Sequence, residues 1–103
     1  MTLTSKERAE LRAEAHRLSP LVHVGHQNLT DAVIQTIDDA LRTHELVKVA
    51  LAKASDVKPK DASHALAEKL GADVVQTIGR TCTLYRENPD LKRKKGAPPP
   101  WRA

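Results

Sequence analysis

The clearest pattern of strand, helix and strand in this chain is in residues 21–51, LVHVGHQNLTDAVIQTIDDALRTHELVKVAL. The run from Leu21 to Val24 reads as a short strand that ends at Gly25. Thr30 can cap a helix that extends to about His44, and the alternation from Leu46 to Leu51 predicts a second strand. The apolar side chains of the helix recur at spacings of three and four, at Val33, Ile34, Ile37, Ala40 and Leu41. The order strand, helix, strand predicts a parallel pair, because parallel neighbours need a crossover connection.

Two further helices flank this unit. Thr4-Ser5-Lys6-Glu7 has the pattern of a capping box and opens a helix that we expect to reach about Arg17. Residues 52–60 read as a polar linker. Asp61 then caps a third helix, and Gly71 is suited to end it.

The last elements are two strands, residues 74–78 and 81–85, joined by a turn at Gly79-Arg80. The resulting order is α-β-α-β-α-β-β. It predicts a compact α/β (α+β two-layer) fold with a mixed, mostly parallel sheet packed by helices. We expect a domain over residues 1–86 and a basic, proline-rich tail over residues 87–103, which should be disordered in isolation because it has few apolar residues.

The positive charge of the chain lies in this tail. The 103 residues carry a net charge of +4, yet residues 1–85 hold eleven basic and eleven acidic side chains. Residues 86–103 hold six basic side chains and two acidic ones. Binding of a polyanion by the body must therefore come from local sorting of charge on its surface.

Several classes of site and location find no support in the sequence. Cys82 stands alone and there is no CxxC motif, so we expect a reducing compartment, no structural zinc and a buried structural thiol. The five histidines lack HExxH spacing and a carboxylate pattern, so we expect no metal, no cofactor and no catalysis. The charged N-terminus and the absence of a long apolar run predict a cytoplasmic protein without a signal peptide or membrane span.

The first candidate site is the loop Gly25-His26-Gln27-Asn28, which precedes a helix N-terminus. Glycine allows close approach of a ligand, and free helix amides attract phosphate. Such a loop suits the clamping of a sugar-phosphate backbone. The alternative is an ordinary strand-to-helix turn in which Gly25 only solves a steric problem.

Basic side chains form three further candidates for RNA contact. Arg8, Arg12 and His16 share one flank of the first helix, and Glu7, Glu10 and Glu14 share the other. Lys48 and Arg80 would extend the surface, and the run Lys92-Arg93-Lys94-Lys95 would attract any polyanion. The alternatives are a solvated helix face with ion pairs and a solubilising tail.

The ordered segments resemble the CRM-domain family, whose stand-alone bacterial members are the YhbY-type proteins. The matching stretches cover about residues 3–86: Leu11-Arg12, Ala15-His16, Pro20, Val24-Gly25, Leu29-Thr30, His44-Glu45-Leu46-Val47-Lys48-Val49, Val75-Gln76-Thr77-Ile78-Gly79 and Leu84-Tyr85-Arg86. The resemblance implies a KH-like fold similar to the C-terminal domain of bacterial translation initiation factor three. It also implies binding of structured RNA and association with precursors of the large ribosomal subunit.

The family's loop is typically G-x-x-G, and Asn28 replaces the second glycine here. Asparagine tolerates a positive φ better than other non-glycine residues, but its side chain stands where the family offers bare backbone.

From the candidate sites and the resemblance together, we expect a monomeric, non-enzymatic protein that binds ribosomal RNA by backbone and shape. The alternative is a protein-interaction module that docks on ribosomal proteins or assembly factors through its proline-rich end and Trp101.

Overall fold

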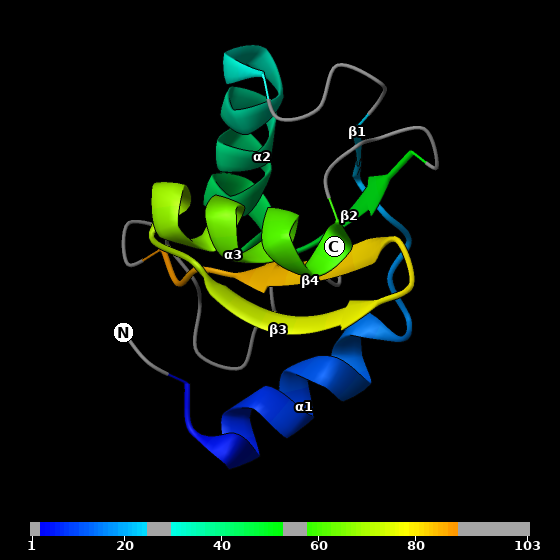
Figure 1. Ribbon diagram of the computed structural model, residues 1–103. Helices are drawn as coiled ribbons and strands as arrows, with labels where there is room; N and C mark the ends of the chain where they lie inside the picture. The colour runs from blue at the N-terminus through cyan, green and yellow to red at the C-terminus, as the bar shows by residue number, and fades with distance from the viewer. Residues whose placement is uncertain (1–2, 25–29, 53–57, 89–103) are drawn as a thin grey trace.

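The computed structural model describes residues 3–24, 30–52 and 58–88 of the chain. These residues form three helices and four strands in the predicted order (Figure 1). The elements are α1 (Ser5–Ala15), β1 (Val22–Val24), α2 (Asp31–His44), β2 (Leu46–Leu51), α3 (Pro59–Leu70), β3 (Asp73–Ile78) and β4 (Thr81–Tyr85). The predicted fold class, an α+β fold with a mixed sheet packed by helices, is confirmed.

The sheet has the strand order β1-β2-β4-β3, and this order corrects one prediction. β1 pairs with β2 in parallel, but β4 pairs antiparallel with both β2 and β3. The sheet is therefore not mostly parallel, although β1, β2 and β3 all run in one direction. The crossover through α3 leaves a gap of one strand between β2 and β3, and the hairpin at Gly79-Arg80 folds β4 back into that gap. Gly79 has a φ of +55°, which the tight turn requires.

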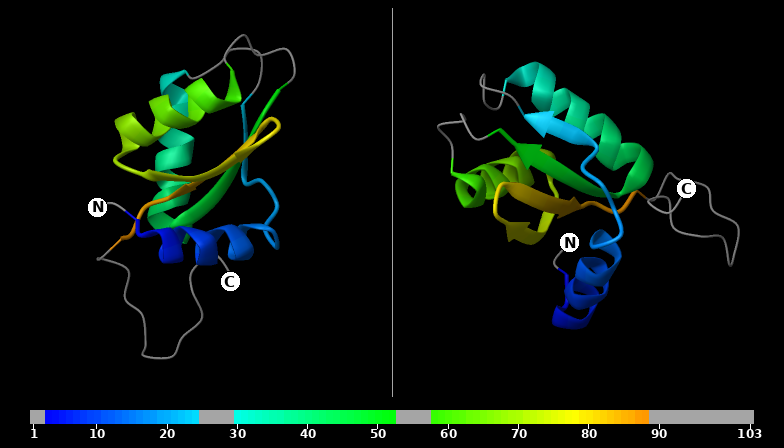
Figure 2. Two further views of the ribbon diagram at one scale, coloured as in Figure 1. Left: turned by 60° about the horizontal axis from the view of Figure 1, so that its bottom comes forward. Right: turned by 90° about the vertical axis from the view of Figure 1, so that its right-hand side faces the viewer.

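Helices cover both faces of the sheet. α2 and α3 lie on one face and bury the larger core, while α1 lies on the other face (Figures 1 and 2). The two-layer description thus holds for the sheet with α2 and α3, and α1 adds a partial third layer. The larger core contains Ile37 and Leu41 of α2, Leu66 of α3, and Cys82 of β4, as the apolar spacings predict. The smaller core joins Leu3 and Leu11 to Leu46 and Val75 on the α1 face.

The ends of two helices differ from the sequence prediction. α3 begins at Pro59 with Lys58 as its N-cap, so Asp61 is not the cap and residues 59–60 are not linker. Proline fits the first helical position because its fixed φ suits the helix and no partner is needed there for an N–H. Asp61 remains in the first turn, where its charge favours the helix dipole. α1 ends at Ala15, after which a tighter turn at His16 and Arg17 leads the chain toward β1.

The residues after β4 return to the end of α2. Glu45, the buried C-cap of α2, has a φ of +64° and accepts a hydrogen bond from the N–H of Asn88 through Oε2 at 2.6 Å. Its carbonyl oxygen accepts a second hydrogen bond from the N–H of Arg86 at 2.9 Å. Asn88 Nδ2 also donates to the carbonyl oxygen of Arg42 at 2.8 Å. Ordered contacts therefore extend to Asn88, two residues beyond the predicted domain boundary.

Candidate functional site

The carboxyl ends of β1 and β2 meet the β3–β4 turn at one edge of the sheet. The N–H of Ala52 donates to the carbonyl oxygen of Val24 at 2.8 Å, and the N–H of Leu51 donates to that of Arg80 at 2.7 Å. Arg80 Nη1 donates in turn to the carbonyl oxygen of Ala52 at 3.2 Å. Arg80 therefore lies beside the point where the chain leaves β1 for residues 25–29. In α/β sheets, ligands bind outside such carboxyl ends.

Two helix N-termini point to the same end of the sheet (Figure 1). α2 begins here because it runs antiparallel to β1 and β2, and Thr30 Oγ1 accepts the N–H of Val33 at 3.2 Å. The start of α3 lies at this end as well, since Ser63, in its second turn, shares a hydrogen bond of 2.9 Å with Thr77 near the end of β3. Lys58, the N-cap of α3, and Lys60, in its first turn, are both exposed. These two lysines were not among the predicted site residues, because residues 52–60 were expected to form a linker; Pro59 is the signal in the sequence that a helix begins there.

The basic flank of α1 faces away from the acidic one. Arg12 and His16 are exposed, and Arg8 is half-buried. Glu7, Glu10 and Glu14 line a groove together with Tyr85, so the opposite flank is turned away from Tyr85. The carboxyl-terminal end of α1 lies at the same end of the molecule as the β3–β4 turn (Figure 1; Figure 2, left), and His16 is the C-cap of this helix. The structure thus brings His16 and Arg80 to one end of the molecule.

Lys48 has a contact inside the fold. It lies on the α1 face of the sheet, and its Nζ donates to the carbonyl oxygen of Ala15 at 3.1 Å. This ammonium therefore caps the carboxyl-terminal end of α1, where a positive charge is favoured by the helix dipole. The alternation of the strand did not reveal which helix would lie over Lys48. We infer from this contact that Lys48 stabilises the fold, and we do not place it in the RNA interface.

Two predicted groups of RNA-binding residues lie outside the described residues. They are the loop Gly25-His26-Gln27-Asn28 and the run Lys92-Arg93-Lys94-Lys95. The structure shows only the two ends of the loop, Val24 and the cap of α2 at Thr30.

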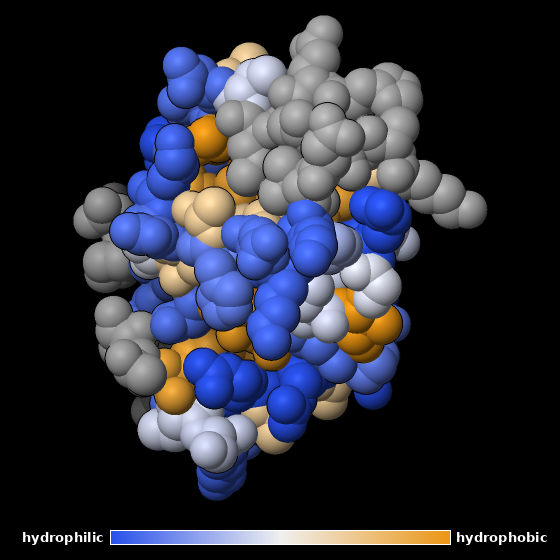
Figure 3. Space-filling model, viewed as in Figure 1, coloured by the Kyte–Doolittle hydropathy of each residue, from blue (hydrophilic) through white to orange (hydrophobic). Residues whose placement is uncertain are grey.

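The described surface is mainly hydrophilic. Polar side chains cover most of the face formed by α3, β3 and α1, where apolar side chains show in small, separate areas (Figure 3). The exposed large apolar side chains among the described residues are Leu21 and Ile78. Within these same ranges, no helix is long and apolar enough to cross a membrane, and no three His, Cys, Asp or Glu side chains are placed so that they could hold one metal ion.

Cys82 is buried beneath α3, as its alternation with Leu84 predicts. Burial raises the pKa of its thiol, while a hydrogen bond with Ser63 lowers it to a smaller extent. A protonated thiol without access to solvent is a poor nucleophile. This environment fits a packing role for Cys82.

Sequence comparisons link the chain to RNA-binding proteins. It is 36% identical over 91 residues to "Probable RNA-binding protein YqeI" of Bacillus subtilis (strain 168), covering 88% of this chain and 95% of that protein. It is 37% identical over 91 residues to "RNA-binding protein" of Haemophilus influenzae, covering 88% and 92%. An archaeal relative, "Probable RNA-binding protein MJ0652" of Methanocaldococcus jannaschii, is 36% identical over 95 residues, covering 88% of this chain and 69% of that protein.

A solved structure has the same fold. The solution structure of SAV1595 from Staphylococcus aureus matches with a TM-score of 0.67 and 33% sequence identity, covering 88% of this chain and 95% of that one. The family description "CRS1 / YhbY (CRM) domain" matches residues 3–86, which span every helix and strand described above. The chain belongs to the CRS1/YhbY (CRM) domain family.

Proposed function

We propose that this protein binds RNA through the sugar-phosphate backbone, at the end of the sheet where β1 and β2 finish. The observation that carries the proposal is the meeting of Val24, Arg80 and the capped N-terminus of α2 at this end. The loop Gly25-His26-Gln27-Asn28 connects Val24 to that N-terminus in the sequence, and the described residues at its two ends offer helix amides at α2 and the Arg80 guanidinium near Val24. Both groups bind phosphate oxygens.

The α1 flank extends this interface. Arg12 and His16 are exposed on it, with Arg8 half-buried beside them, and the Lys92–Lys95 run adds attraction that does not depend on sequence. Lys58 and Lys60 add positive charge at the N-terminus of α3. These groups recognise phosphate and backbone shape, so the interface needs no stacking aromatic side chain. The protein acts as a monomer and catalyses no reaction.

We further propose that the RNA is ribosomal RNA in precursors of the large subunit. The names of the relatives support RNA as the partner. The choice of ribosomal RNA extends the resemblance to the YhbY-type proteins. A site that reads backbone and shape suits the structured RNA of an assembling ribosomal particle.

The salt dependence of binding to a ribosomal RNA fragment tests this interface. Contact with about five phosphates should weaken binding by roughly 100-fold to 500-fold between about 50 and 200 mM salt, with the larger loss for a double-helical RNA. Arg12→Glu should weaken binding and make its salt dependence less steep. Lys69→Glu is the matched control, because it makes the same charge change in the last turn of α3, at the opposite end of that helix from Lys58.

Two outcomes would refute the proposed interface. One is binding that survives high salt or requires a ribosomal protein, which would favour a protein-interaction module. The other is an equal loss for Arg12→Glu and Lys69→Glu, which would show a response to net charge alone. Cosedimentation with large-subunit precursors, followed by crosslink mapping, tests the choice of RNA separately.

A further inference from the structure

The acidic flank of α1 borders a groove with an apolar floor. Leu3, Leu11 and Tyr85 contribute apolar surface, and the carboxylates of Glu7, Glu10 and Glu14 line the same hollow of about 190 Å³. Leu3 and Leu11 belong to the smaller core, which fixes the floor in place. The groove therefore offers negative charge over an apolar base.

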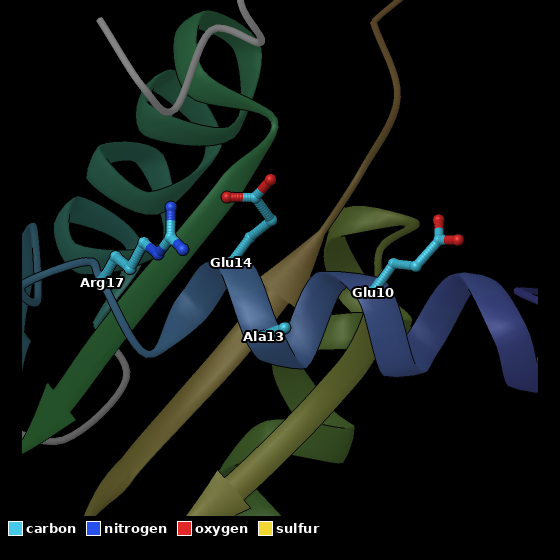
Figure 4. A pocket seen from close by; sticks show the side chains of 4 residues that line it. All are labelled: Glu10, Ala13, Glu14 and Arg17. Atoms are coloured by element: carbon cyan, nitrogen blue, oxygen red, sulfur yellow. The ribbon is translucent and has the colours of Figure 1, made fainter.

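A second hollow, of about 320 Å³, continues this groove along α1. Glu10 and Glu14 line both hollows, and Arg17 stands at the far end of the second. Figure 4 shows the side chains of Glu10, Glu14 and Arg17 on one side of the helix. From Glu7 to Glu14 the acidic row extends about 10 Å, at roughly 1.5 Å per helical residue.

The chain itself carries a segment of matching charge within reach of this groove. Tyr85 is in the groove wall, and Asn88, only three residues later, is held on the end of α2. The run Lys92-Arg93-Lys94-Lys95 begins four residues after Asn88, and four extended residues span up to about 14 Å. The run itself is about 10 Å long when extended, which equals the length of the acidic row.

We infer that the basic run Lys92-Arg93-Lys94-Lys95 docks along the acidic groove formed by Glu7, Glu10 and Glu14 of the same chain. Charge complementarity favours this occupant, because four positive side chains meet three carboxylates. The short connection favours it further, since an attached segment has a high effective concentration at a site within its reach. Each exposed ion pair contributes little by itself, roughly 0–1 kcal/mol, so the docked state is reversible and sensitive to salt.

The inferred docking would regulate RNA binding, and this consequence rests on the proposed function. The same four side chains cannot pair with the groove and with RNA phosphates at once. RNA must therefore displace the run from the groove before the run can contribute to affinity. An RNA with a high density of phosphates would therefore release the run from the groove more readily than a short, weakly charged ligand would.

Zero-length carbodiimide crosslinking of the full chain tests the docking without RNA. At low protein concentration and low salt, we expect amide crosslinks within one chain from Lys92, Lys94 or Lys95 to Glu10 or Glu14, mapped by mass spectrometry. Their yield should fall several-fold at about 0.5 M salt, where charges are screened within a few ångströms. Glu68, exposed on α3, is the matched control carboxylate and should give no comparable yield.

Three results would overturn the inference. They are crosslinks spread equally over Glu68 and the groove, absence of groove crosslinks, and crosslinks that join two chains in proportion to concentration. RNA affinity provides a second measurement. Glu10→Gln with Glu14→Gln should raise affinity several-fold, and the gain should vanish when the four basic residues are changed to glutamine. If the chain binds no RNA, the crosslinks still decide the docking, so the two proposals fail separately.

Discussion

Arg86→Ala should destabilise the fold without altering the RNA interface. Arg86 Nη1 donates to Asp38 Oδ1 at 2.8 Å and to the carbonyl oxygen of Leu70 at 2.9 Å. Its Nη2 donates to the carbonyl oxygen of Asp38 at 3.2 Å. One guanidinium thus joins α2, the end of α3 and the segment after β4.

The expected loss follows from the exposure of this cluster. A hydrogen bond to a charged group contributes about 1.5–3 kcal/mol when it is protected from water, and an exposed ion pair about 0–1 kcal/mol. The Arg86 and Asp38 side chains are 22% and 23% exposed, so water partly replaces the lost bonds. We expect Arg86→Ala to lower the free energy of unfolding by about 2–3 kcal/mol, or Tm by roughly 10–20 °C.

Urea denaturation followed by circular dichroism measures this change. Arg42→Ala is the control, because Arg42 pairs with the same carboxylate but its side chain is 59% exposed, so its loss should be under about 0.5 kcal/mol. Equal losses for the two variants, or a loss below about 0.5 kcal/mol for Arg86→Ala, would refute this role of Arg86. Folded Arg86→Ala should retain the salt dependence of RNA binding.

Three further predictions concern buried or paired groups. Lys48→Met removes the hydrogen bond to Ala15 and should lower the free energy of unfolding by about 1 kcal/mol in a urea titration, with the salt dependence of RNA binding unchanged. Cys82 should react with iodoacetamide only when the protein unfolds. Burial raises the pKa of its thiol, so the stability that the protonated thiol contributes is present below about pH 8.5 and is lost as the pH rises through the pKa of the folded state. Stability measurements at rising pH would detect this loss. The hydrogen bond from Arg86 lowers the pKa of Asp38, so the stability that the ionised carboxylate contributes is present above about pH 4 and is lost as the pH falls through the pKa of the folded state. Asp38→Asn should remove this part of the decrease in urea midpoint at acid pH.

Local signals in the sequence predicted most of the elements. The capping box at Thr4 and Glu7 forms as predicted, with Glu7 N–H to Thr4 Oγ1 and Thr4 N–H to Glu7 Oε1 both at 3.1 Å. The cap at Thr30 and the positive φ of Gly71 also agree with prediction. These features depend on residues a few positions apart, so a short window of sequence contains their causes. The predicted start of α3 at Asp61 was wrong, because Pro59 suits the first helical position and the helix begins there, although its N-cap Lys58 makes no side-chain cap hydrogen bond.

The candidate site was only partly accessible to such reasoning. The sequence identified the loop after β1, Arg80 and the charged flanks of α1, because each follows from periodicity or from position at the end of a strand. Which of these lie together depends on contacts between segments far apart in the chain. Arg80 meets Ala52, 28 residues away, and Lys48 meets Ala15, 33 residues away. Neither partner could be chosen from local pattern.

The amino-acid sequence was enough to predict the order of helices and strands, the apolar faces of α2 and β2, and the neutral charge balance of residues 1–85. Two features became known only from the folded chain: β4 inserts between β2 and β3, and α1 covers the face opposite α2 and α3. The folded chain also shows that Lys48 donates to the last residue of α1 and that Arg80 lies near the carboxyl end of β1. The difference arises because periodicity predicts only which side of a helix or strand is buried. Packing and hydrogen bonding across the whole chain select the other element that covers this side.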